Sequence, residues 1–257
     1  MTQSNFNRRA LTLIELVVVL AILVALAGLA VPMFGGLASQ TNGSTNAVVV
    51  GEVNSAIGTY FSRFDGHADG WDSLLNSSDT LFSKLHPALT TSATLSGSIL
   101  SSTPQSLTNL QAESLNTLVG IDYLTDADET SGLSPNTPGT QQRPVEVGRK
   151  VVMLNRNSAL AAEAFGISSQ NSDLWPHDFV VVGLGGATGI RGQTMMEVPL
   201  VLSADPSERY ARVLCVFLVP GSSATTTFPA RYLGCFLPDG TSLRQNIDRY
   251  HTNRIGN

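Results

Sequence analysis

An uncharged apolar run near the N-terminus constrains this chain more than any other feature of its sequence. From Leu16 to Phe34 no residue is charged. As a helix, these residues would be about 28 Å long, close to the roughly 30 Å hydrocarbon core of a bilayer. Arg8 and Arg9, just before the run, favour leaving this end of the chain in the cytoplasm. The sequence therefore predicts a single membrane-spanning helix, with the body of the protein on the far side of the membrane.

Glu15 is the one charged residue between Leu11 and Phe34, and it lies at the start of the apolar run. A carboxylate at mid-helix costs about 2.5–3.5 kcal/mol on insertion scales, and less near the interface. Once buried, it needs a cationic partner or must take up a proton. Because no Lys or Arg occurs between Arg9 and Arg63, the helix has no such partner of its own. A new α-amino group, made by cleaving the chain just upstream of Glu15, would supply one.

The stretch from Ala10 to Leu16, ALTLIEL, resembles the class III signal peptide of type IV pilins and type II secretion pseudopilins. That family has a short basic leader, a small residue before the cleavage site and Glu at the fifth mature position. The resemblance implies cleavage by a prepilin peptidase between Ala10 and Leu11, followed by N-methylation. Glu15 then falls at the fifth mature position and Pro32 at the twenty-second, where the family often has proline. Ala10 departs from the pattern, since glycine is usual before the cut.

This resemblance implies a structural subunit, with no enzymatic activity and no cofactor. The processed chain would be held in the cytoplasmic (inner) membrane by its helix and then assembled into an extracytoplasmic filament. The implied partners are other copies of the chain, other pilins or pseudopilins, the prepilin peptidase, the inner-membrane assembly machinery and the lipid bilayer. In the filament, Glu15 would neutralise the N-terminal ammonium of a neighbouring Leu11. The resemblance covers pilus subunits and secretion pseudopilins alike.

Two other interpretations of the N-terminus remain open. Arg8 and Arg9, the apolar stretch and the A-x-A sequence at 25–27 also fit a conventional signal peptide, which would leave Gly28 first. The run could equally be an uncleaved anchor. Either gives an exported or membrane-anchored binding or adhesive protein that does not polymerise. Against the conventional signal, Glu15 interrupts the apolar region and strong hydrophobicity continues to Phe34.

The charge balance argues against nucleic acid as a ligand. The net charge is −5, and Lys84 and Lys150 are the only lysines. Charged residues make up 14% of the chain, well below the usual quarter, whereas the hydrophobic share of 42% is ordinary for a folded protein. Such a chain lacks the basic surface that binds phosphates. We expect no nucleic-acid partner and a polar, largely uncharged surface.

Hydrophobic periodicity beyond the apolar run predicts an α+β fold with a pilin-like layout. Val49, Val53, Ile57 and Tyr60 follow helical spacing, which indicates one helix from Leu11 to about Phe64. Pro32 and the nearby glycines predict a weak point within residues 28–43. We divide the chain into a leader (1–10), a transmembrane and filament-core helix (11–34), its amphipathic continuation (35–64), a helix- and loop-rich part (65–144) and a β-rich part with a short C-terminal helix (145–257).

The β-rich part is expected to form an antiparallel sheet onto which the long helix packs. Thr103-Pro104 reads as the start of a helix in the preceding part, ending at Gly120. Leu243, Ile247 and Tyr250 suggest the short C-terminal helix. The candidate strands are 145–154, 179–184, 198–202, 210–219 and 231–237, of which 210–219 is apolar on both faces, as in a central strand.

Cys215 and Cys235, the two cysteines of the chain, allow one disulfide. If the body is exported, pairing is expected. The bridge would close a loop of about 21 residues and stabilise the fold by about 3 kcal/mol. Two buried free thiols are the alternative. Two cysteines are too few for a structural zinc site.

A glycine-rich stretch is the strongest hint of enzymatic chemistry, but its spacing does not match the motif that it resembles. Residues 179–189, FVVVGLGGATG, are similar to the dinucleotide-binding G-x-G-x-x-G, but the third glycine is displaced by one position. Gly192 and Pro199 follow closely and leave no room for a full helix that could face a pyrophosphate. We predict a glycine-rich turn between strands and no catalytic site.

Metal binding has similarly weak support. Asp126, Asp128 and the residues up to Thr137 resemble a calcium loop, but the glycine comes one position late and the closing residue is not Glu. A solvated acidic turn is the preferred interpretation, with a cation site as the alternative. The four histidines, at positions 67, 86, 177 and 251, show no metal-ligand spacing. We therefore assign no metal site.

Overall fold

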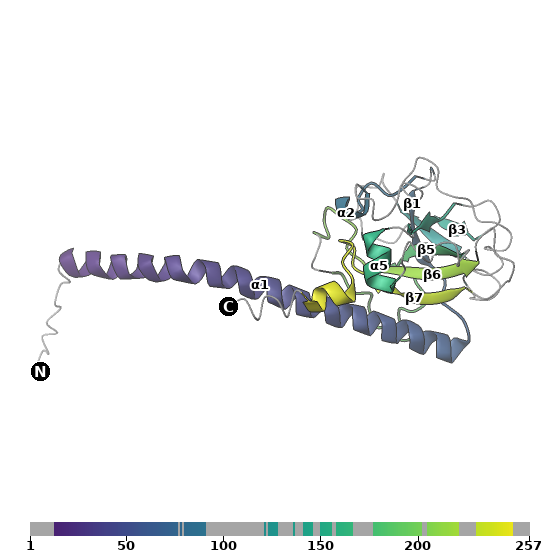
Figure 1. Cartoon of the computed structure of the whole chain (residues 1–257), viewed down its shortest axis with the longest axis horizontal. Helices are drawn as coiled ribbons and strands as arrows, with labels where there is room; N and C mark the ends of the chain where they lie inside the picture. Colours follow the sequence, from purple (N-terminus) through teal and green to yellow (C-terminus); the bar gives the residue numbers. More distant parts are fainter. Residues whose placement is uncertain are drawn as a thin grey trace, which may run out of the picture.

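The structure is a computed structural model of the chain. It describes residues 13–76, 78, 80–90, 121, 123–127, 136, 141–145, 150–155, 158–166, 177–201, 205–220 and 230–248, with the backbone alone for 29–40, 126, 127, 143, 177 and 220. The described part is an α+β fold in which one long helix carries a folded body at its C-terminal end (Figure 1).

The long helix, α1, spans Leu13–Phe64 and is 52 residues long. Its C-terminal end confirms the boundary that hydrophobic spacing predicts, and Asp65 leaves the helix with a positive φ of 54°. The weak point expected within residues 28–43 does not interrupt it. Proline removes one backbone donor from a helix, and the hydrogen bonds on either side can carry the helix past it.

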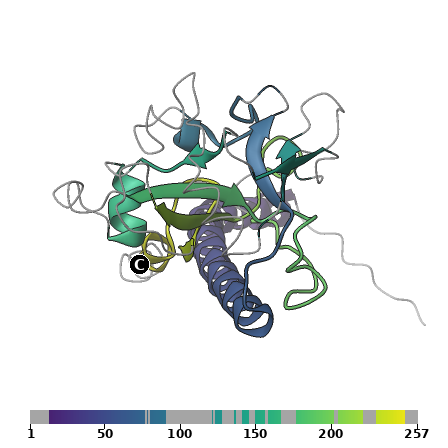
Figure 2. The ribbon, with the colours of Figure 1, turned by 90° about the vertical axis from the view of Figure 1, so that its right-hand side faces the viewer.

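The two halves of α1 have different surroundings. The first half projects away from the body, and the second half lies along one face of the sheet (Figures 1 and 2). Val50, Val53 and Ile57 are buried there, at the three- and four-residue spacing that places side chains on one face of a helix. This half packs against the edge strand β7 (Arg231–Phe236). The amphipathic pattern at 49–64 therefore reflects packing on the body.

The body is built on a seven-stranded sheet in the order β3-β2-β1-β5-β6-β7, with β4 paired to β5. Its remaining strands are β1 (Trp71–Asn76), β2 (Tyr123–Ala127), β3 (Gln142–Pro144), β4 (Val152–Met153), β5 (His177–Gly183) and β6 (Leu214–Pro220). β1 and β2 are parallel, and every other pair is antiparallel.

The expectation of a purely antiparallel sheet is therefore wrong, because the sheet is mixed. It also begins before residue 145, since β1, β2 and β3 lie in the part that we expected to be rich in helices and loops. Parallel strands need a long crossover between them. The crossover from β1 to β2 runs through residues 77–122, so no hairpin signal marks this pair in the sequence.

Some of the strands predicted for the β-rich part are confirmed and others are not. β5, β6 and β7 confirm 179–184, 210–219 and 231–237, and β6 lies inside the sheet between the other two. Of 145–154, residues 152–153 form β4. Of the predicted stretch 198–202, the described residues 198–201 form no strand and contribute one isolated bridge, from Leu200 to Arg212. Pro199 explains this difference, because proline has no N–H to donate to a ladder.

Three short helices complete the described part of the body. α2 spans Pro87–Thr90 and α5 spans Ala159–Phe165. Ser158 caps α5 by accepting a hydrogen bond from the Ala161 N–H, at 3.0 Å, and Gly166 ends it with a φ of 67°. Residues 243–248 are helical, which confirms the short C-terminal helix. The helix predicted from Thr103 to Gly120 lies outside the described residues.

Candidate functional site

The residues with predicted roles in processing and assembly belong to α1 or precede it. Ala10 and Leu11 lie outside the described residues. Glu15 lies in the first turn of α1, where the partial positive charge of the helix N-terminus favours a carboxylate. Pro32 lies within α1, where the structure describes the backbone alone.

The first turns of α1 carry a continuous set of exposed apolar side chains, which we call the apolar surface of α1. Its members are at least half exposed, from 50% at Val18 to 81% at Leu13. They are Leu13, Ile14, Leu16, Val17, Val18, Val19, Leu20, Ile22, Leu23, Val24 and Leu26. They surround the helix on all sides, so they do not form a single face that one flat surface of the body could cover. A helix that is apolar all round is normally buried in protein or lipid.

Among the residues that the structure describes, no helical window is both long enough and apolar enough to cross a membrane.

The second half of α1 is fixed to the body by polar contacts as well as by packing. The Tyr232 hydroxyl donates to Asn54 Oδ1 at 2.6 Å, and the Thr194 hydroxyl donates to the carbonyl of Ala56 at 3.0 Å. These bonds join α1 to β7 on one side and to the loop after β5 on the other. The body and the apolar surface are therefore carried by one continuous helix.

Cys215 and Cys235 are directly opposite each other on β6 and β7, and both are buried free thiols. The expected disulfide is therefore absent from the structure. The Cys235 thiol is instead directed at α1, with its sulfur 3.8 Å from the Val50 carbonyl and 3.5 Å from Asn54 Oδ1. Burial raises the pKa of the Cys215 thiol, which keeps it protonated and unreactive.

His67 lies just beyond α1 in a cluster of aromatic rings. Its ring is 4.8 Å from that of Phe61, 5.0 Å from that of Phe217 and 6.2 Å from that of Tyr232, measured between centroids. Burial lowers the pKa of His67 to about 4, so the ring is neutral at pH 7. The residue therefore fills the core and is no candidate for acid–base chemistry near neutrality.

A polar network that the sequence analysis missed lies around Asp72 on β1. The Tyr210 hydroxyl donates to Asp72 Oδ2 at 2.7 Å, and Thr125 Oγ1 is 2.8 Å from Asp72 Oδ1. Burial raises the pKa of Asp72, although these two hydrogen bonds and the charge of Arg212 lower it in part. The network joins β1, β2 and the segment before β6.

The glycine-rich stretch packs directly against the side chains of this network. As predicted, Gly183 ends β5 and Gly185 lies in the turns that follow, and residues 184–201 form no helix. A Cβ at Gly183 would collide with the Tyr210 hydroxyl, and one at Gly185 would collide with Asp72 Oδ1. The glycines therefore leave room for the Asp72–Tyr210 pair.

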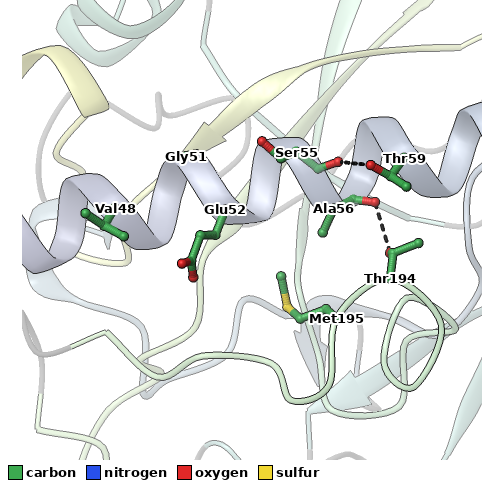
Figure 3. A pocket seen from close by; sticks show the side chains of 8 residues that line it. All are labelled: Val48, Gly51, Glu52, Ser55, Ala56, Thr59, Thr194 and Met195. Carbon is green, nitrogen blue, oxygen red and sulfur yellow. Dashed lines mark hydrogen bonds between the residues drawn. The ribbon is translucent and has the colours of Figure 1, made fainter.

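A shallow groove of about 630 Å³ lies beside the second half of α1, and we call it the α1 groove. Figure 3 shows the helix along one side and Met195 on the other, with the side chain of Glu52 projecting from the helix toward the space between them. The lining residues are Val48, Gly51, Glu52, Ser55, Ala56, Thr59, Thr194 and Met195. Most are small or apolar, and Glu52 is the one charged member.

Metal ligation finds no support in the described part of the chain. No three His, Cys, Asp or Glu side chains gather there in a way that could hold an ion. His86 Nδ1 accepts a hydrogen bond from the Ala88 N–H at 3.1 Å. Most of the acidic stretch from Asp126 to Thr137 and all of His251 lie outside the described residues, as does the side chain of His177.

Comparison of the chain with protein-family models, with curated proteins and with solved structures finds no significant match. The geometry of the chain itself must therefore support any functional assignment. In the described part of the chain, two surfaces of α1 stand out, the apolar surface at residues 13–26 and the groove along residues 48–59.

Proposed function

We propose that this chain is a subunit of a type IV pilus-like or type II secretion pseudopilus filament. A prepilin peptidase cleaves it between Ala10 and Leu11, and the helix holds the processed chain in the cytoplasmic membrane with the body outside the cytoplasm. The inner-membrane assembly machinery then builds it into a filament with other copies or related subunits. Residues 11–34, including Pro32, pack in the filament core.

The observation that carries this proposal is the exposed apolar surface of α1. Its eleven large apolar side chains are at least half exposed, and they lie on the part of α1 that projects away from the body (Figure 1). Exposed apolar area of this kind is costly at about 25 cal/mol per Å², so the surface requires lipid or other helices around it. A subunit that is first stored in a membrane and then polymerised uses both surroundings in turn.

Glu15 distinguishes a filament subunit from a simple anchor. In an apolar filament core, its carboxylate pairs with the ammonium group of a neighbouring Leu11. Two charges 4 Å apart gain about 4 kcal/mol at an effective dielectric constant of 20, before the cost of desolvation. This gain favours the one register in which amine and carboxylate meet. A monomeric anchor has no neighbouring chain whose amine this carboxylate could meet.

The test is a series of substitutions at Glu15, read out as filament yield and as membrane content. Glu15→Leu and the isosteric Glu15→Gln both remove the charge, and each is expected to insert into the membrane normally yet lower filament yield. Glu15→Asp keeps the charge and should retain most of the yield. Glu208→Gln, at an exposed turn of the body, is the matched control and should assemble normally. Normal filaments from the Leu and Gln variants would rule out this role for Glu15.

A further inference from the structure

The α1 groove presents hydrogen-bond acceptors to whatever occupies it. The Thr59 hydroxyl donates to the Ser55 carbonyl at 2.8 Å (Figure 3). On the other wall, the Thr194 hydroxyl donates to the Ala56 carbonyl at 3.0 Å. Because a hydroxyl has one hydrogen and two lone pairs, each threonine offers a ligand only its lone pairs while these bonds hold. The N–H groups of Thr194 and Met195 are directed at a carbonyl of their own loop, so a ligand would have to supply the donors.

Glu52 gives the groove a negative charge that no cation in the described part of the chain balances. Its side chain is exposed and projects from α1 toward the space between the helix and Met195 (Figure 3). None of the eight described residues that line the groove is Lys, Arg or His. Arg191, on the loop that carries Met195, is paired with Glu197 at 2.7 Å. Within the described residues Glu52 forms no ion pair, so its carboxylate can accept a cation from another molecule.

The rest of the lining suits the stem of a long basic side chain. Val48, Ala56 and Met195 add apolar atoms to the same groove as Glu52. Lys and Arg side chains bury their methylene stems along apolar surface while the charged head stays in water. From Val48 to Thr59 the helix rises about 17 Å, the length of about five residues of extended chain. Sites for small molecules enclose most of their ligand, so a shallow groove of this length fits a peptide segment better.

We propose that the α1 groove binds an extended segment of a partner protein through one lysine or arginine side chain, whose charged head pairs with Glu52. Two other occupants fit less well. An apolar segment would remove the Glu52 carboxylate from water without pairing it, which is costly. A divalent metal ion needs more oxygen ligands than one carboxylate provides, and in the described part of the chain no three His, Cys, Asp or Glu side chains gather to hold one.

This inference goes beyond the proposed function and does not depend on it. The groove lies on the half of α1 that packs on the body, so it exists whether or not the chain is cleaved after Ala10 or assembled. An exposed ion pair changes affinity by about two- to fivefold and is screened by salt. One such pair mainly selects and orients a partner, and the remaining contacts of the segment supply the rest of its affinity.

The experiment titrates a capped pentapeptide, GSRSG, into the full chain in an uncharged detergent and follows the methyl signal of Met195 by NMR. Methyl labelling with ¹³C gives one signal for each of the five methionines, and Met195→Leu identifies its signal by loss. A second peptide carries citrulline, which has nearly the shape of arginine but no charge. The arginine peptide is expected to bind about two- to fivefold more tightly than the citrulline peptide. High salt should largely remove this difference.

Glu52→Gln tests whether this carboxylate recognises the positive charge. In this variant the two peptides should bind equally, with the affinity that the citrulline peptide has for the unaltered chain. Glu208→Gln removes the same charge at an exposed turn outside the groove and should keep the preference for arginine. Removing both charges together should cost no more than removing either one, as expected in a double-mutant cycle for two groups in direct contact.

A paired glycine substitution tests the position of the bound peptide. Gly51 lines the groove and Gly58 does not, and a Cβ at either meets no atom within 4 Å, so both variants should fold. Gly51→Leu partly fills the groove and is expected to weaken binding of both peptides by about fivefold or more. Gly58→Leu should leave both affinities unchanged. Equal affinities in the two variants would place the peptide outside the groove and overturn the inference.

Three other results would also overturn the inference. They are equal affinity of the two peptides for the unaltered chain, a preference for arginine that survives in Glu52→Gln, and no shift of the Met195 signal with either peptide at millimolar concentration. The titration needs neither cleavage nor filaments, so its failure leaves the proposed function to be decided by the Glu15 series. Conversely, a preference for arginine that depends on Glu52 would stand even if the Glu15 variants assembled normally.

Discussion

At the scale of single residues, the Asp72 network makes the clearest prediction. Asp72→Asn keeps a side chain of the same shape, with an oxygen to accept from Tyr210 and an amide to donate to Thr125. Asp72→Ala leaves the Tyr210 hydroxyl without this partner, at a cost of about 1–3 kcal/mol. Urea unfolding of the detergent-solubilised chain at pH 7 should therefore rank Asp72→Asn as clearly more stable than Asp72→Ala. Equal losses in the two variants would contradict the hydrogen-bonded role of Asp72.

His67 gives the fold a pH dependence of known sign. Its pKa is about 4 in the folded chain and 6.5 in the unfolded chain, so folding favours the neutral ring. The stabilisation is complete above pH 6.5 and is lost as the pH falls toward 4, by up to about 3 kcal/mol. His67→Phe should remove this loss, as measured by denaturant unfolding between pH 7 and pH 4. A variant that loses as much stability as the wild-type chain over this range would disprove the assignment.

The pKa of Asp72 acts in the opposite direction. Because burial raises it, the protonated acid is favoured by folding, and its contribution falls as the pH rises through the raised pKa. Comparing the pH dependence of the wild-type chain with that of Asp72→Asn isolates this contribution, since asparagine does not titrate. The wild-type chain should lose stability relative to Asp72→Asn as the pH is raised from about 4. A difference that is constant with pH would contradict the raised pKa.

Glycine substitutions test why the glycine-rich stretch is there. Gly185→Ala places a Cβ against Asp72, and we expect it to destabilise the body by about 1–3 kcal/mol. Gly58→Ala is the matched control, because its Cβ meets nothing within 4 Å and alanine favours a helix over glycine by about 0.5–1 kcal/mol. The two changes should therefore shift the unfolding midpoint in opposite directions. Shifts of the same sign would argue against the packing role of Gly185.

At the scale of elements, β6 and β7 bring the two cysteines together without joining them. Both thiols are buried and Cys235 faces α1, so a maleimide should label them only after the chain is unfolded. The mass of the intact chain should also be unchanged by a reductant. A loss of 2 Da on oxidation, reversed by the reductant, would restore the disulfide that the sequence suggested.

Elements with strong local patterns could be predicted from the sequence, and those that depend on distant partners could not. Spacing alone gave α1 its end at Phe64, and the continuous apolar run at 213–219 marked a strand buried on both faces. β1 was missed because its six residues, WDSLLN, alternate poorly and include Asp72. An aspartate in a sequence normally predicts a solvent-exposed position. The hydrogen-bond partner of Asp72, Tyr210, lies 138 residues away in the chain. No local sequence pattern predicts a buried hydrogen bond between two residues so far apart.

The same contrast applies to the candidate site. Glu15 and the apolar run could be found from the sequence because a long uncharged apolar run with one carboxylate at its start is rare in soluble chains. The α1 groove left no such signal, since Thr194 reaches Ala56 across 138 residues of sequence. Small residues on a helix and a methionine in a loop are individually ordinary. Only the fold places them on two sides of one groove.

At the scale of the whole molecule, the chain is asymmetric. A body with a well-packed core sits at one end of α1, and an uncovered apolar helix extends from the other (Figure 1). Such a shape is incomplete as a monomer in water, because the apolar surface has no covering of its own. Lipid and neighbouring helices can each supply that covering, and the proposed storage and polymerisation would use them in turn.

The most direct test of this account is the N-terminal residue of the chain recovered from filaments that have been sheared from its native cells. Mass spectrometry of the N-terminal peptide should find Leu11 as the first residue, carrying an N-methyl group. A first residue of Gly28, or an intact Met1, would leave Glu15 without the amine that it is proposed to meet. Either result would contradict assembly through the N-terminal helix.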